Sequence, residues 1–241
     1  MRYFVLLLAL VTGFAHGSDY AREKKWADEI TPGIVAGDPL YLEAVGHKFL
    51  GIYTEASGAK KAVIVVHGIG VHPDWNMIGI LRTSLAEQGY TTLSIQMPVL
   101  AVDAKPKQYG PTLGEADARL KAAVDFLQAK GYRKLAIVSH SMGSRMSRHY
   151  LSGHPDSPIS AWVAIGIPGG DDFKGINIPV LDLYGENDLP EIVASAKQRA
   201  ATLKAKGSVQ TRVPKADHFF SNRETELVKL TKDYLDKTLG D

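Results

Sequence analysis

One short stretch of the sequence combines a serine with the local structure that could make its hydroxyl reactive. The apolar run Leu135–Ser139 predicts a buried strand, and His140-Ser141-Met142-Gly143 follows it directly. A serine on a sharp strand-to-helix turn is held in a strained conformation that exposes its hydroxyl, and small neighbours prevent a clash. Ser141 is therefore the candidate nucleophile. The alternative is a serine that only caps the following helix, because short motifs also occur by chance.

A serine hydroxyl needs a histidine base, and that histidine needs a carboxylate to orient it. Asp188 follows the apolar run Val180–Tyr184, and His218 follows the last predicted strand. Both are expected at carboxyl ends of strands, where the ligand crevice of an open α/β sheet forms. The sequence thus predicts that Ser141, Asp188 and His218 act together, in this chain order.

Other acidic residues could orient His218 in place of Asp188. We favour Asp188 because its distance from the strand end suits the role and because Pro190 would begin a helix just behind it. The alternatives left open are Asp171, Asp172 and Glu186.

A loop that contains two glycines follows the first predicted parallel strand. Acyl transfer places negative charge on the carbonyl oxygen of the substrate, and backbone N–H groups aimed at that oxygen stabilise it. The expected donors are the N–H of Met142 and that of Ile69 or a neighbouring residue. Four residues in and after this loop are expected to line the substrate site: His67, Gly68, Gly70 and Trp75.

Other chemistries have less support. The loop lacks the third glycine of a G-x-G-x-x-G dinucleotide fingerprint, and its histidines do not have the H-E-x-x-H spacing of a zinc site. The absence of cysteine excludes a thiol nucleophile, a thiolate metal site and disulfides. We therefore expect neither a metal nor a cofactor.

Several polar residues near these motifs have a simpler explanation. His140 should point away from the nucleophile, and Asp182 lies inside a strand, where a structural role is expected. Arg145 and Arg148 stand about one helical turn apart. They could bind an anionic substrate, but this spacing usually marks a solvated helix face.

The elements that must position these residues alternate between short apolar runs and amphipathic segments, as in βα units around a mostly parallel sheet. Leu40–Leu50 and Gly51–Glu55 are expected to form an antiparallel pair at the sheet edge. The predicted parallel strands are Ala62–His67, Thr91–Gln96, Lys134–Ser139, Ala161–Ile167, Ile178–Tyr184 and Ser208–Val213.

Helices are expected between these strands. Met77–Gln88 and Pro190–Lys204 are two of them, and a further one should follow Gly143. Capping-box spacing predicts two more helix starts, at Thr112 with Glu115 and at Ser221 with Glu224.

Composition and the N-terminus indicate where the protein acts. The chain has 241 residues, 45% of them apolar, and a net charge of +2 that provides no footprint for nucleic acid. Residues 1–17 have the basic start, short apolar core and small residues of a cleaved signal peptide. The apolar run is too short for a membrane span, so no stable membrane insertion is expected after cleavage. Residues 18–37 remain unassigned, and residues 38–241 form the predicted domain. The protein is expected to be exported, with a bacterial periplasm as the first expectation and full secretion as the alternative.

Taken together, four motifs resemble the successive landmarks of the α/β-hydrolase superfamily, over residues from about 40 to 239. They are His67-Gly-Ile-Gly, Ser139-His-Ser-Met-Gly, Gly185-Glu-Asn-Asp and Asp217-His. Ser139 replaces the first glycine of the usual G-x-S-x-G. Within the superfamily, the loop that begins at His67 and the segment Thr92–Pro98 are similar to a group of exported bacterial proteins of unknown function.

The resemblance implies an α/β-hydrolase fold without a large lid domain, with Ser141 as nucleophile, His218 as base and Asp188 as the orienting acid. It implies no particular substrate, because one fold serves many activities. The leading hypothesis is a metal-free serine hydrolase that cleaves small carboxylic esters or thioesters through an acyl-enzyme. The alternatives are an acyltransferase with the same residues and a non-catalytic binding or envelope protein that kept the fold. The oligomeric state is left open.

Overall fold

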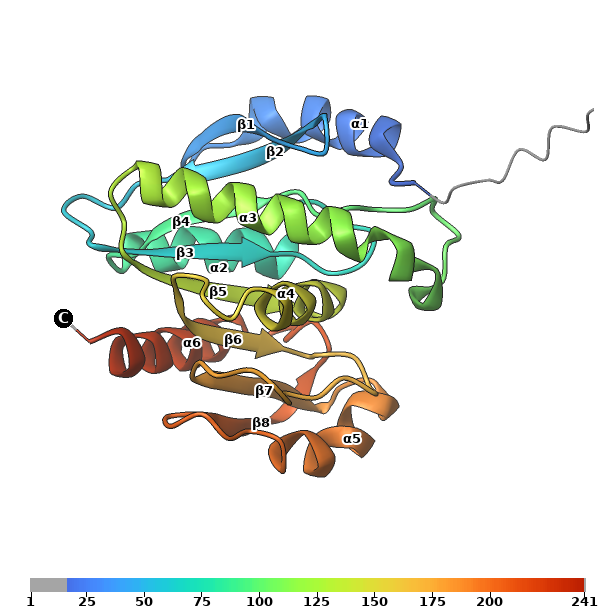
Figure 1. The fold of residues 1–241 in the computed structure, drawn as a ribbon, viewed down its shortest axis with the longest axis vertical. Helices are drawn as coiled ribbons and strands as arrows, with labels where there is room; N and C mark the ends of the chain where they lie inside the picture. Colours follow the sequence, from blue (N-terminus) through green and yellow to red (C-terminus); the bar gives the residue numbers. More distant parts are fainter. Residues whose placement is uncertain (1–16, 241) are drawn as a thin grey trace, which may run out of the picture.

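The computed structural model describes residues 17–240, so the predicted signal peptide lies outside the described residues except for Gly17. A single sheet of eight strands runs through the centre of this part of the chain (Figure 1). Its strands are β1 (Asp38–Ala44), β2 (His47–Thr54), β3 (Lys61–Val66), β4 (Thr91–Ile95), β5 (Lys134–His140), β6 (Ile159–Ile165), β7 (Val180–Asn187) and β8 (Val209–Asp217).

The strand order places the predicted functional residues at one edge of the sheet. The order is β1-β2-β4-β3-β5-β6-β7-β8, and β2 runs antiparallel to both of its neighbours. The strands from β4 to β8 pair in parallel. The carboxyl ends of β3, β5, β7 and β8 therefore meet at the same edge. This arrangement confirms the predicted fold class.

The antiparallel pair at the start of the sheet exists, but its predicted boundaries were wrong. The turn lies at Val45-Gly46, where Ala44 pairs with His47, and not after Leu50. Both turn residues have positive φ, +46° and +73°. A two-residue turn of this kind matches the twist of the flanking strands, so the hairpin closes earlier than the apolar run suggested.

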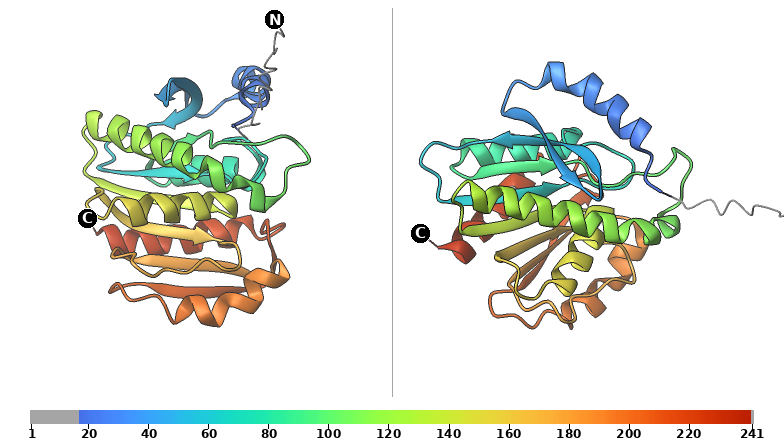
Figure 2. Two further views of the ribbon diagram at one scale, coloured as in Figure 1. Left: turned by 45° about the vertical axis from the view of Figure 1, so that its right-hand side comes forward. Right: turned by 45° about the horizontal axis from the view of Figure 1, so that its top comes forward.

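Helices cover both faces of the sheet. In Figure 1, α3 and α4 lie in front of it and α2 and α6 behind it, and the rotated views of Figure 2 show the same layers. Each layer has its own apolar core, one built with α3 and α4 and one with α2 and α6. The helices are α1 (Tyr20–Ile30), α2 (Asn76–Glu87), α3 (Leu113–Ala129), α4 (Met142–Gly153), α5 (Pro190–Ala200) and α6 (Glu224–Leu239), with 3₁₀ helices η1 (Thr31–Gly33) and η2 (Pro106–Thr112).

The helix predicted to start at Thr112 is present, because α3 begins at Leu113 with Thr112 as its N-cap residue, but neither predicted capping box is formed. Thr112 has helical backbone angles, and its hydroxyl donates to the carbonyl of Tyr109, because η2 runs directly into α3 and supplies that turn. The second helix begins at Glu224, and the N–H of Ser221 donates to Asp217. At Thr112 the preceding turn therefore binds the hydroxyl that a cap would use.

The segment 18–37, which the sequence left unassigned, forms α1 and η1. Asp19 caps α1 by accepting the N–H of Arg22 at 3.0 Å. One face of α1 packs Ala27 against Leu50 and Ile52 of β2. α1 therefore forms a small apolar cluster with β2 at the antiparallel end of the sheet (Figure 2).

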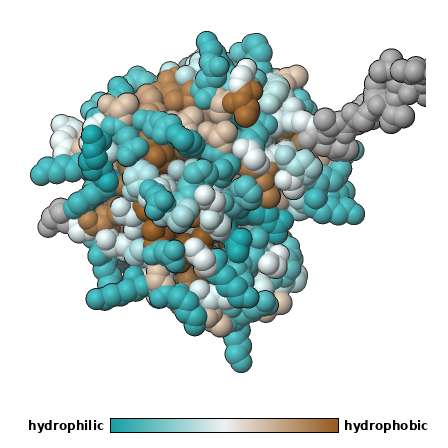
Figure 3. All heavy atoms as spheres, viewed as in Figure 1, coloured by the Kyte–Doolittle hydropathy of each residue, from teal (hydrophilic) through white to brown (hydrophobic). Residues whose placement is uncertain are grey.

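The carboxyl edge of the sheet is not covered by a separate lid domain within residues 17–240. β6 and β7 are joined by an irregular connection, 166–179. In the same range, no helix has the length and apolar character that a membrane span needs. Hydrophilic residues cover most of the face seen in Figure 1, and hydrophobic residues gather in small areas between them (Figure 3).

Candidate active site

Ser141 occupies the tight turn between β5 and α4. Its φ of +53° and ψ of −123° lie in a region that non-glycine residues rarely adopt. The N–H of Ser141 donates to the carbonyl of Ile165 at 2.8 Å, which fixes the turn to β6. A Cβ at Gly143 would come within 2.3 Å of the carbonyl oxygen of His67. The close approach of these two loops therefore requires glycine at position 143.

Ser139, which departs from the G-x-S-x-G pattern, is accommodated by the core. Its side chain is buried, and its hydroxyl accepts the indole N–H of Trp162 at 2.8 Å. It also bonds the hydroxyl of Ser144 at 3.1 Å. The hydroxyl thus points into the sheet–helix interface and leaves the space in front of Ser141 free.

The three residues predicted to act together are brought into one chain of hydrogen bonds. His218 Nδ1 lies 2.6 Å from Asp188 Oδ1, and His218 Nε2 lies 3.0 Å from Ser141 Oγ. A carboxylate can only accept, so Nδ1 carries the proton and Nε2 is free to accept from the serine hydroxyl. The Asp188 carboxylate also accepts the N–H groups of Leu189, at 2.8 Å, and Gly185, at 3.3 Å. These bonds fix the plane of the carboxylate against the imidazole.

The alternative acids are engaged elsewhere. Asp171 and Asp172 lie in the loop after β6, and each forms an ion pair with α4, at 2.7 and 2.9 Å. These pairs bind the guanidinium groups of Arg145 and Arg148 to the loop after β6. The two arginines therefore neither bind an anionic substrate nor form a freely solvated helix face. The pairs of the three alternatives are Asp171 with Arg145, Asp172 with Arg148, and Glu186 with Arg212.

His140 does not point away from the nucleophile, contrary to the prediction. Its ring packs against that of His218 with 4.6 Å between centroids, and its Nε2–H donates to the carbonyl of His218 at 2.9 Å. Burial, with His218 beside it, lowers the pKa of His140 to about 3. His140 is therefore neutral at ordinary pH and holds the backbone of the candidate base. Its place at the end of β5, next to Ser141, was the signal that sequence reasoning discounted.

His67 and Gly70 do not line the cavity, so this part of the predicted substrate site was wrong. His67 is buried, and its Nδ1–H donates to the carbonyl of Gly68 at 2.8 Å. Its Nε2 accepts the N–H of Met97 at 2.8 Å. Burial lowers the pKa of His67 to about 3. The neutral ring therefore supports the glycine loop from behind, while the carbonyl of Gly70 turns toward Arg22.

The two predicted backbone donors flank Ser141 at the cavity. Met142 is the first residue of α4, where N–H groups have no partner within the helix. Within residues 17–240, the N–H groups of Met142 and Ile69 donate to no protein acceptor. The start of α4 also carries the positive end of the helix dipole. The arrangement suits an oxygen that becomes negative beside Ser141.

A cavity of about 290 Å³ opens in front of Ser141. Its walls are mainly apolar, and Trp75 and Phe219 meet edge to face at 5.4 Å. Among residues 17–240, Glu191 is the one carboxylate that lines the cavity, and no lysine or arginine of this range does. The part of the chain that the structure describes contains no cluster of three or more potential metal ligands. The lining residues are Gly68, Ile69, Val71, Trp75, Pro106, His140, Ser141, Met142, Pro168, Leu189, Glu191, Ile192, His218 and Phe219.

Solved structures with the same architecture are numerous. Dienelactone hydrolase from Anabaena variabilis superposes with a TM-score of 0.72 at 19% identity, covering 83% of this chain and 96% of that one. Est1E from Butyrivibrio proteoclasticus gives 0.68 at 15% identity, over 84% and 99% of the two chains. XC6422 from Xanthomonas campestris, described as a serine hydrolase without a lid, gives 0.68 at 16% identity, over 86% and 97%.

These similarities, with the strand order and the elbow at Ser141, show that the chain has the α/β-hydrolase fold. Residues 36–118 match the profile of a family described as a protein of unknown function (DUF3530). That match covers less than half of the chain. No curated protein matches the sequence significantly.

Proposed function

We propose that the protein is a serine hydrolase that cleaves carboxylic esters or thioesters. The observation that carries the proposal is the continuous hydrogen-bonded chain from Asp188 through His218 to Ser141, at the floor of an apolar cavity. The two N–H groups of Ile69 and Met142 beside it support an acyl-transfer mechanism, because such donors stabilise the tetrahedral intermediate.

In the first half of the proposed reaction, Ser141 Oγ attacks the carbonyl carbon of the ester while His218 Nε2 takes the hydroxyl proton. The carbonyl oxygen becomes negative and accepts from the N–H groups of Ile69 and Met142. When the intermediate collapses, the bond to the leaving alkoxide or thiolate breaks and His218 returns the proton to it. An ester between Ser141 and the acyl group remains.

In the second half, water enters and His218 removes one of its protons. The resulting attack on the acyl carbon forms a second tetrahedral intermediate, whose collapse breaks the bond to Ser141 and returns the proton to Oγ. Asp188 holds the Nδ1–H tautomer throughout and stabilises the imidazolium form of His218. Protein groups and water are sufficient for both halves.

The cavity supports substrates with a small or medium apolar acyl group. Its volume of about 290 Å³ and its aromatic and aliphatic walls favour such groups over long lipid chains. Two of the similar structures support the ester class: one is named a dienelactone hydrolase, and Est1E has also been solved with ferulic acid bound. The signal-like residues 1–17 support export. We therefore place this activity outside the cytoplasm, with a bacterial periplasm as the first expectation.

The test is hydrolysis of p-nitrophenyl butyrate by the mature protein and three variants. Ser141→Ala and His218→Ala should reduce kcat at least about 10⁴-fold. Ser147→Ala is the matched control, since Ser147 lies in α4 and its buried hydroxyl has no hydrogen-bond partner within the described residues. It should hydrolyse the ester like the wild type. A folded wild-type protein that hydrolyses no ester of a chain-length series would overturn the proposal, and product formed only with an added alcohol acceptor would indicate an acyltransferase.

A further inference from the structure

The N-terminal helix α1 reaches the glycine loop that supplies one of the two proposed oxyanion donors. Arg22 donates from Nη2 to the carbonyl of Gly70 at 3.1 Å and from Nη1 to the carbonyl of Leu100 at 2.8 Å. Its guanidinium carbon lies over the ring of Trp26, four residues further along α1, at 4.4 Å from the ring centroid. One side chain therefore ties α1 to two loops at the carboxyl edge of the sheet.

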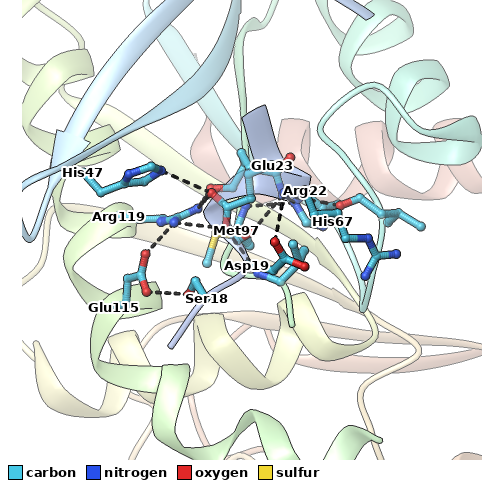
Figure 4. A network of polar contacts seen from close by, with 12 residues as sticks. Ser18, Asp19, Arg22, Glu23, His47, His67, Met97, Glu115 and Arg119 are labelled. Atoms are coloured by element: carbon cyan, nitrogen blue, oxygen red, sulfur yellow. Dashed lines mark hydrogen bonds and ion pairs between the residues drawn. The ribbon is translucent and has the colours of Figure 1, made fainter. Parts of the chain in front are cut away.

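A second connection joins α1 to the same loop from its other end, and it begins with the contact between Glu23 and Arg119 (Figure 4). Glu23, which is buried, pairs with Arg119 of α3 at 2.9 Å, and Arg119 donates to the carbonyl of Gln96 at 3.0 Å. The side-chain nitrogen Nε2 of Gln96 lies 2.9 Å from His67 Nε2. His67 in turn donates to the carbonyl of Gly68. The loop 68–71 is thus held at Gly68 through this chain of contacts and at Gly70 by Arg22 directly.

Within the described residues, the loop has one further side-chain contact, a long hydrogen bond of 3.4 Å from Gln96 Nε2 to the carbonyl of Val71. Gly70 has a φ of +66°, so the chain reverses at a residue that can adopt many other conformations. Gly68, Ile69 and Val71 line the cavity, and the proposed mechanism requires the Ile69 N–H to point toward the reacting oxygen. Arg22 is the side chain that fixes the carbonyl one residue after Ile69. Without it, the peptide groups on either side of Gly70 can rotate.

We propose that Arg22 is a positioning residue for the oxyanion loop 68–71, and that docking of α1 completes the active site. The inference rests on the proposed function. Among the described residues, Arg22 is not one of those that line the cavity, and it acts through the backbone of Gly70. Its contribution should therefore appear in the stabilisation of the tetrahedral intermediate, with little effect on ground-state binding.

The experiment compares the mature wild type with Arg22→Ala and Arg22→Lys. The matched control is Lys25→Ala, an exposed cation of the same helix whose pair with Glu29 is a loose 3.8 Å. Steady-state hydrolysis of p-nitrophenyl butyrate gives kcat and KM, and inhibition by butylboronic acid reports on a tetrahedral adduct. Hydrogen–deuterium exchange of a peptide covering the loop 68–71 follows its mobility without reference to catalysis.

For Arg22→Ala we expect kcat to fall about 10- to 100-fold, because the donor is displaced and not removed. KM should change little, the boronic acid Ki should rise in parallel with the loss of kcat/KM, and the loop should exchange faster. Arg22→Lys should recover part of the loss, since an ammonium group can reach one carbonyl but cannot span two. Lys25→Ala should match the wild type in all readouts.

Three results would overturn the inference. Arg22→Ala could keep the kcat, Ki and loop exchange of the wild type. It could raise KM alone, which would assign Arg22 to substrate binding. The fraction of active protein could fall together with Tm while each remaining active site keeps the wild-type kcat. Arg22 would then have a structural role only. Failure of the proposed function looks different, because the wild type itself would then neither hydrolyse the ester nor bind the boronic acid.

Discussion

The buried bond between Ser139 and Trp162 gives a sharp test of how this chain replaces the usual glycine before the nucleophile. The indole N–H of Trp162 donates to Ser139 Oγ at 2.8 Å, and neither side chain is more than 1% exposed. Ser139→Ala removes the acceptor and leaves a buried N–H without a partner, which costs about 1–3 kcal/mol. Ser144 keeps its bond to the carbonyl of Ser139 at 2.9 Å. We therefore expect a loss of about 2 kcal/mol in the free energy of unfolding.

Urea denaturation followed by far-UV circular dichroism measures this loss. At an m-value of about 3 kcal/mol/M, the midpoint should fall by about 0.7 M urea. Ser160→Ala is the control, because Ser160 is exposed on β6 and should shift the free energy by less than about 0.5 kcal/mol. In a Trp162→Phe background the same Ser139→Ala change should cost about 1 kcal/mol less, as a double-mutant cycle reveals. A midpoint for Ser139→Ala equal to that of Ser160→Ala would refute the reasoning.

Three further predictions concern the acidic residues. Asp188→Asn should lower kcat about 10⁴-fold by favouring the wrong tautomer of His218. Asp171→Asn should keep most of the activity. Equal losses of kcat in an ester assay would reject Asp188 as the acid that orients His218. Burial raises the pKa of Glu23 from 4.5 to about 7. Between these two pH values the folded state holds a proton that the unfolded state has lost. The free energy of unfolding should therefore fall by about 3 kcal/mol as pH rises from about 4.5 through about 7. Glu23→Gln should abolish this slope in urea titrations at a series of pH values, and an unchanged slope would place its origin elsewhere. Glu191→Gln should raise kcat/KM for an anionic ester about fivefold relative to a neutral one of equal size, and an unchanged ratio would show that Glu191 does not select substrates.

The order and type of the main elements could be predicted because strands covered on both faces are almost wholly apolar. β3, from Lys61 to Val66, is buried along nearly all its length and stands out in the sequence. The first hairpin was harder, because its two-residue turn begins with Val45, a residue that rarely adopts positive φ. Turn conformation, not hydrophobicity, set that boundary.

The candidate site was predictable where chain order and strand ends fix position, as for Ser141, Asp188 and His218. Side-chain direction was not predictable in the same way. His67 follows a strand at the right edge, yet its ring turns inward to bind Met97. His140 was expected to face away from Ser141, yet it stacks on His218.

The role of α1 could not be read from the sequence, because its anchors are charged residues that usually mark a solvated face. Glu23 and Arg119 are separated by 96 residues and meet in a buried pair. Only the folded chain brings them together. Their burial shows that a charge pattern alone does not separate a surface helix from one tied to a site.

The most direct test of the account is the site at which a fluorophosphonate probe reacts with the mature protein. The label should form a covalent bond to Ser141 Oγ and be found there by peptide mass spectrometry, while Ser141→Ala and His218→Ala, shown to be folded by circular dichroism, should remain unlabelled. Labelling of another residue in the wild type, or equal labelling of the Ser141→Ala variant, would contradict the assignment of Ser141 as an activated nucleophile.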